Sequence, residues 1–154
     1  MSRLLACCAL VAFQSRLAFA SPKAPARPFL VAERSVHCGA GWVLSFFPNG
    51  RIEQVTTDTC VRPRHTKRTL TVAPETVRSL QGLVADAQFT ALPALIKPEG
   101  IVTDEDRLVL TVWLGGKEHS VSAEGLERST PSPEAHRFLV VWSAVLEAIA
   151  GAGQ

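Results

Sequence analysis

Two cysteines and two histidines lie near enough in the chain to raise the question of a metal site or a reactive thiol. His37, Cys38, Cys60 and His65 would supply two sulfur and two nitrogen ligands of the kind that zinc accepts. Their spacing, with 21 residues between the cysteines, matches no standard zinc finger. A disulfide between Cys38 and Cys60 would also remove both thiolates, and with them any nucleophilic cysteine. The pattern therefore predicts one structural disulfide, with no metal and no catalytic thiol.

The other polar residues form no recognised catalytic motif. The chain has no G-x-S-x-G, no H-E-x-x-H and no phosphate-binding glycine loop, so neither catalytic residues nor a cofactor are predicted. His136, Ser143 and Glu147 fall on one side of the last expected helix, and we interpret them as a solvent-exposed face. His119 is expected to face Val112 on the inner side of a hairpin.

Carboxylates gather in the segment from Thr103 to Asp106, just before an expected strand. Alternate acids can bind calcium, but the glycine and the distal glutamate of an EF-hand are missing. We therefore interpret the segment as an acidic turn. A catalytic site built from His65, His119 and this turn stays open as the alternative, and a buried pocket joining them would favour it.

Basic residues gather directly after Cys60. Arg62, Arg64, Lys67 and Arg68 bring four formal charges within seven residues. We expect a loop here, and an exposed one, since burying four like charges without partners would be very costly. A solvated loop without a function would have the same composition. The segment is nevertheless the best candidate for a partner contact, because loops on rigid hairpins commonly carry function.

The first 20 residues read as a secretory signal peptide. Arg3 supplies the positive charge, the stretch from Leu4 to Phe13 is apolar, and Ala18 to Ala20 is an A-x-A cleavage site. The mature chain is therefore expected to begin at Ser21 and to be secreted or periplasmic. A lipoprotein signal ending at Cys7 is not expected, since only three apolar residues precede that cysteine. No later segment reaches the roughly 18 apolar residues of a transmembrane span.

The net charge of the mature chain argues against some classes of binding partner. The whole chain has 16 basic and 14 acidic residues, and the signal holds two arginines and no acid, which leaves 14 of each sign in the mature part. A neutral chain without a dominant basic face argues against a nucleic-acid partner. It argues equally against a protein dedicated to anionic membranes. An unknown protein partner is possible, and the basic segment could bind an acidic partner or a phosphate.

The residues after the signal predict a flexible, proline-rich leader over 21–35 and one domain over 36–151, with a domain start near Phe29 as the alternative. A hairpin over 42–57 turns at Asn49-Gly50, which places Phe47 opposite Ile52. In that register the two cysteines are one residue out of alignment, and a bulge at 39–41 would correct the offset. A second hairpin, over 107–122, turns at Gly115-Gly116 and places Leu110 opposite Val121.

Two helices complete the expected domain, together with a short strand at 68–72. The first helix opens at Pro74. The second opens at Pro133 with Ser132 as its cap, and Gly151 ends it. Its apolar stripe comprises Phe138, Val141, Trp142, Val145, Leu146 and Ile149. The predicted fold is α+β: an antiparallel sheet built from two hairpins and a short strand, with both helices packed on one face.

The order of these elements and a few short landmarks carry a resemblance. Phe89-x-x-Leu92 follows the first helix, Thr103-Asp104 precedes the second hairpin, and Gly116-Lys117 stands in its turn. The stretch from Trp42 to Ile149 resembles small secreted bacterial domains of unknown function. The resemblance implies the fold and a location in the bacterial envelope, and it carries over no catalytic residue.

These observations favour an exported, non-catalytic binding or accessory domain of the bacterial envelope. One form of this hypothesis is an inhibitor of an extracellular enzyme, which would use a rigid hairpin as a preorganised wedge. The alternative is a small secreted hydrolase with an unrecognised active site.

Overall fold

The computed structural model describes residues 26–36, 38–58, 64–97, 106–126 and 132–152. They form one seven-stranded sheet and two long helices, with a single 3₁₀ turn at Phe89–Ala91. The strands are β1 (Leu30–Ser35), β2 (Ala40–Phe46), β3 (Arg51–Asp58), β4 (Arg64–Thr71), β5 (Leu95–Ile96), β6 (Arg107–Leu114) and β7 (Lys117–Glu124). The helices are α1 (Pro74–Asp86) and α2 (Pro133–Ala152).

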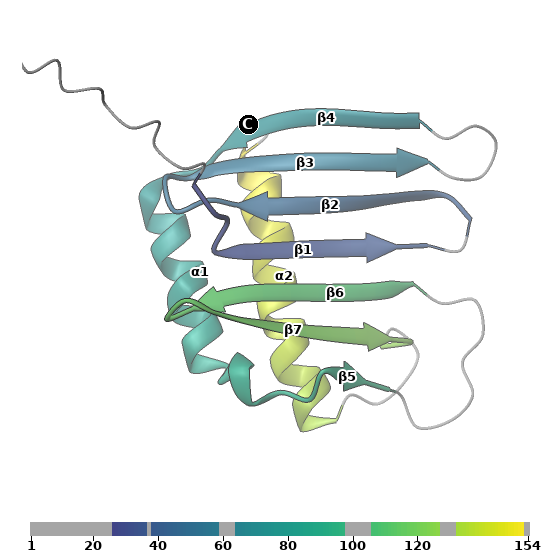
Figure 1. Cartoon of the computed structure of the whole chain (residues 1–154), viewed down its shortest axis with the longest axis vertical. Helices are drawn as coiled ribbons and strands as arrows, with labels where there is room; N and C mark the ends of the chain where they lie inside the picture. Colours follow the sequence, from purple (N-terminus) through teal and green to yellow (C-terminus); the bar gives the residue numbers. More distant parts are fainter. Residues whose placement is uncertain (1–25, 37, 59–63, 98–105, 127–131, 153–154) are drawn as a thin grey trace, which may run out of the picture.

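The strands follow the order β4-β3-β2-β1-β6-β7-β5 in one mixed sheet. Every neighbouring pair is antiparallel except β5 and β7, which are parallel. Both helices lie on the same side of the sheet, and α2 crosses it from the β5 end toward β4 (Figure 1). The α+β class is therefore confirmed, but the expectation of two hairpins and one short strand was wrong.

The strand β1 lies within the segment that the sequence marked as a flexible leader. It pairs with β2 on one side and with β6 on the other, so it is a central strand. The side chains of Leu30 and Ala32 are fully buried on the helix face. The domain therefore starts near Phe29 rather than at residue 36. The sequence predicted no strand here, because the short apolar run of β1 is stabilised by pairing with β2 and β6.

The strand β4 replaces most of the predicted basic loop. Arg64 to Arg68 belong to it, and the short strand expected at 68–72 is its second half. Arg62 lies outside the described residues. The prediction of exposure is confirmed for the described members of the basic segment, and the prediction of a loop is wrong.

The first hairpin turns over three residues instead of two. Gly50 N–H donates to the carbonyl of Phe47 at 3.0 Å, and Gly50 has a φ of 83°. This is a type I turn with Pro48 in its second position, followed by a glycine in the left-handed region. A two-residue loop would instead have placed Pro48 in the ladder, where it has no N–H to donate. Phe46 therefore lies opposite Ile52, one position from the predicted register.

The second hairpin has the predicted register. Leu110 lies opposite Val121, and Val112 lies opposite His119. Gly115 and Gly116 both adopt positive φ, as a two-residue turn of this kind requires.

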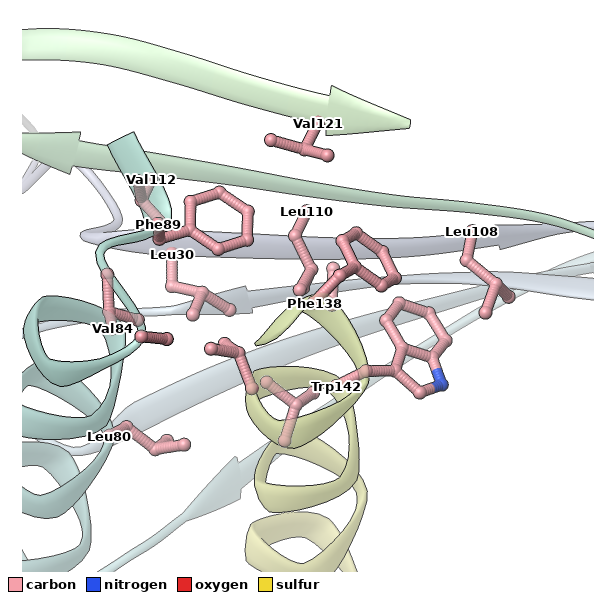
Figure 2. Close-up of a cluster of buried hydrophobic side chains, with 14 of the residues drawn as sticks. Leu30, Leu80, Val84, Phe89, Leu108, Leu110, Val112, Val121, Phe138 and Trp142 are labelled. Carbon is pink, nitrogen blue, oxygen red and sulfur yellow. The ribbon is translucent and has the colours of Figure 1, made fainter. Parts of the chain in front are cut away.

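The core lies between the helix-facing side of the sheet and the two helices (Figure 2). Leu30, Leu110 and Val112 project from the sheet, and Phe138 and Trp142 project from α2. The ring of Trp142 stacks on Trp42 at a centroid separation of 5.3 Å and on Phe138 at 6.1 Å. The stack of Trp142 on Trp42 joins α2 to β2, and Phe138 extends it along α2.

The predicted stripe of α2 is largely confirmed. Phe138, Val141, Trp142 and Val145 are buried, while Leu146 is 42% exposed and Ile149 is partly buried. By length and composition α2 could also cross a membrane, but in this structure its apolar side packs on the sheet.

Local signals set where α2 begins but not where it ends. Ser132 caps the helix as predicted, because its Oγ accepts the N–H of Ala135 at 3.1 Å. Gly151 does not end the helix, which continues to Ala152.

Substituting the central ring of this aromatic stack tests the packing. We expect Trp142→Ala to lower the free energy of unfolding by about 3–5 kcal/mol, because burial is lost and a cavity remains. Leu146→Ala, on the exposed side of the same helix, serves as the control and should change it by less than about 0.5 kcal/mol. Urea unfolding followed by tryptophan fluorescence and circular dichroism measures both. Equal effects would contradict the packing described here.

Candidate contact surface

The basic side chains of the sequence-predicted segment lie on β4, the strand at one edge of the sheet. Arg64, Lys67 and Arg68 are all exposed, and we call these three residues the basic edge. Lys67 points to the open face of the sheet, opposite Val55. Arg64 and Arg68 point to the helix side and stand about 13 Å apart, since a strand rises about 3.3 Å per residue.

Lys67 is anchored by a carboxylate of β3. Its Nζ lies 3.0 Å from Oε2 of Glu53, whose other oxygen accepts a hydrogen bond from Arg51 at 2.6 Å. The hydrogen bond from Lys67 is the main cause that holds the pKa of Glu53 below its ordinary value. The Arg51 guanidinium in turn covers the ring of Phe47 at 3.8 Å. The Lys67 side chain stays 60% exposed, so its charge remains accessible.

Arg68 and His65 are positioned by neutral partners. The Nε of Arg68 donates to Oε1 of Gln54 at 2.6 Å, which fixes the side chain without neutralising it. The Nδ1 of His65 lies 3.0 Å from the hydroxyl of Thr57. Together β3 and β4 carry four cationic residues (Arg51, Arg64, Lys67, Arg68) and two acids (Glu53, Asp58), a net charge of 4 − 2 = +2.

Most of β4 is exposed because the two helices do not cover it. Only its last helix-facing side chain, Leu70, packs against the core, together with Val72 just beyond the strand. From Arg64 to Thr69 every residue is exposed. Most of β4 thus extends beyond the helix layer (Figure 1). An amphipathic alternation is not needed where no core lies beneath the strand.

The backbone of β4 has a free edge. Val72 N–H donates to Gly50, and in an antiparallel ladder the residues that bond to the same neighbour alternate. Leu70, Arg68, Thr66 and Arg64 therefore turn their backbone groups to β3. His65, Lys67 and Thr69 turn theirs outward, and β4 has no second neighbouring strand within the described residues.

The observed register bears on the two cysteines. Opposed residues of β2 and β3 have numbers that sum to 98, from the pair Phe46 and Ile52 to the pair Ala40 and Asp58. Cys38 and Cys60 also sum to 98, so an ideal continuation of the ladder aligns these positions without the predicted bulge. Cys38 lies just before β2, and Cys60 lies outside the described residues. The disulfide stays a prediction.

The histidines proposed for a catalytic site are far apart. His65 lies on β4 and His119 on β7, with four strands between them. At about 4.8 Å per strand the separation is about 24 Å. They also lie on opposite faces, because His119 packs edge-on against the buried Phe89 at 5.9 Å and its Nε2 lies 3.2 Å from the carbonyl of Leu92. No single pocket holds both.

The acidic turn, the polar face of α2 and the possible metal ligands were the other candidate sites. Of the acidic turn, only Asp106 belongs to the described residues, and it binds Arg34 of β1. His136, Ser143 and Glu147 are exposed, as predicted. Among the described residues, no group of three or more histidine, cysteine or acidic side chains could hold a metal ion. His37 lies outside them.

A groove with a volume of about 570 Å³ lies between the start of α1 and the end of α2. Small side chains form much of its wall, and its two carboxylates are Glu75 and Glu147. Glu75 is paired with Arg78 at 2.7 Å, and Glu147 is exposed. None of the described residues that line the groove is a histidine, lysine or arginine.

No protein family model and no curated protein matches this chain. The likeness to small secreted bacterial domains therefore remains a resemblance of element order and landmarks. Of those landmarks, Phe89 and Leu92 are core residues, which accounts for them structurally.

The alignment of the two cysteine positions leads to a chemical test. We expect thiol titration of the unfolded, unreduced mature protein to find no free thiol, and the same sample after reduction to find two. Replacing both cysteines by serine should lower the free energy of unfolding by about 3 kcal/mol, since a loop of roughly 23 residues is no longer closed. Two titratable thiols before reduction would contradict the bond.

Proposed function

We propose that this protein is an exported, non-catalytic binding or accessory domain of the bacterial envelope that contacts a protein partner through its basic edge. One observation supports this above the others. Three cationic side chains project from a strand at the border of the sheet, and two of them are held in place by Glu53 and Gln54. Positioned but accessible charges are typical of contact surfaces, since less conformational entropy is lost on binding.

The enzymatic alternative receives no comparable support. The histidines that would have formed its site lie on strands at opposite sides of the sheet. An inhibitor of an extracellular enzyme remains one form of the binding hypothesis, with the basic edge as the inhibitory contact.

Export has its own test. N-terminal sequencing of the protein recovered from the periplasm or medium should begin at Ser21, because Ala18 to Ala20 forms the cleavage site. An uncut chain in the membrane fraction, or a lipidated Cys7, would contradict this part of the proposal.

Replacing the basic edge tests the contact. The mature chain is immobilised and exposed to an envelope fraction of the source organism over a range of salt concentrations. We expect Arg64→Ser, Lys67→Ser and Arg68→Ser together to reduce capture by about tenfold and to remove its salt dependence, since exposed charges are screened beyond about 8 Å at physiological ionic strength.

A matched variant controls for total charge. Arg78→Ser, Lys97→Ser and Lys117→Ser remove three exposed cations elsewhere on the surface, and capture should be retained. Equal loss in both variants, or loss in neither, would refute the basic edge as the contact. The melting temperature of both variants should stay close to that of the unmodified chain, because these side chains lie outside the core.

A further inference from the structure

We propose that the basic edge binds an extended acidic peptide segment, which adds to the sheet as an eighth strand beside β4. The inference rests on the proposed function and names the chemistry and conformation of its partner. Two features of the same strand carry it: the direction of the backbone groups and the placement of the charges.

The backbone provides a row of bonding groups in the geometry of a ladder. His65, Lys67 and Thr69 turn their N–H and C=O groups away from β3, as the bond from Val72 to Gly50 establishes. β4 is eight residues long and contains no proline. An added strand can therefore form main-chain hydrogen bonds along its length, which is how sheet edges commonly bind peptides.

The charges disfavour a second copy of this chain as the added strand. If two β4 strands paired antiparallel about their middle, Arg64 would lie opposite Arg68, or Lys67 opposite its own counterpart. Like charges directly opposite each other are destabilising in a sheet. Cationic side chains on an edge strand thus oppose self-association, and the same charges attract a strand that carries carboxylates.

The alternation of side chains defines what the partner must carry. Arg64 and Arg68 lie on the helix side of the sheet, and Lys67 lies on the open face. An antiparallel partner therefore needs acids opposite residues 68, 67 and 64: two adjacent glutamates and a third glutamate three residues later. A parallel partner needs the reverse order. The side chains between them require only strand-forming residues such as threonine and valine.

Synthetic peptides separate strand addition from simple charge attraction. The probes are two end-capped peptides of about nine residues with glutamates in the two orders given above, and with threonine and valine elsewhere. Matched controls have the same sequences with every backbone amide methylated, which keeps the charges and removes the donors. We expect at least one parent peptide to bind the mature chain in fluorescence anisotropy, and methylation to weaken its binding about tenfold.

A substitution on β4 also tests whether main-chain hydrogen bonds contribute to peptide binding. Thr69→Pro removes one outward N–H and keeps all three cations and every bond to β3, because proline is tolerated where an edge N–H faces solvent. Thr69→Val keeps the N–H and serves as the control. We expect Thr69→Pro to weaken the peptide about tenfold and Thr69→Val to leave it unchanged, with similar melting temperatures.

The outcomes distinguish the two proposals. If the peptides bind in a salt-dependent manner but neither methylation nor Thr69→Pro matters, the basic edge attracts acids without strand addition, and this inference is wrong. If neither peptide binds, it is also wrong, while capture from the envelope fraction judges the proposed function separately. If Thr69→Pro does not fold, the methylated peptides decide the question with the unmodified chain.

Discussion

The pairing of β1 with both β2 and β6 is the constraint on which the rest of this structure depends. Without this strand the hairpin of β2 and β3 and the hairpin of β6 and β7 would share no hydrogen bonds. Its helix-facing residue Ala32 lies between Leu44 on β2 and Leu110 on β6, and all three are buried. The joined sheet is broad enough for two helices to cover one face, and its outermost strand extends past them.

The two edges of that sheet differ in whether another segment covers the backbone of the strand. At the β7 edge, the segment after the 3₁₀ turn covers the strand: β5 adds a short parallel ladder, and His119 lies within hydrogen-bonding distance of the carbonyl of Leu92. At the β4 edge, no described segment covers the backbone, and three cations occupy the strand instead. Among the described residues, the charges of this strand are what opposes unwanted pairing at this edge. A partner strand of opposite charge would not be repelled by these cations. The same residues that oppose unwanted pairing of β4 would therefore favour binding of an acidic segment.

Sequence reasoning succeeded where burial imposes a pattern and failed where it does not. The stripe of α2, the cap at Ser132 and the register of the second hairpin are confirmed, because each depends on neighbours in the sequence or on a buried face. β1 was missed because its stability comes from β2 and β6, which are distant in the chain. The first half of β4 was predicted as a loop because it lies over no core, whereas its second half was predicted as a strand. The threonines at 66, 69 and 71 were the available signal, since β-branched residues favour strands.

The end of the sheet where β4 begins is held by several independent contacts. Gly41 approaches β1 so closely that a Cβ added there would lie 2.8 Å from the carbonyl oxygen of Arg34, and the Arg34 side chain binds Asp106 just before β6. Cys38 precedes β2 at this same end, so the proposed disulfide would join β2 to the chain leaving β3. Such a bond would restrain the first residues of β4 where no helix packs against them. An edge strand held in its extended form before a partner arrives loses less entropy on binding, so rigidity at this end of the sheet would favour binding at the edge.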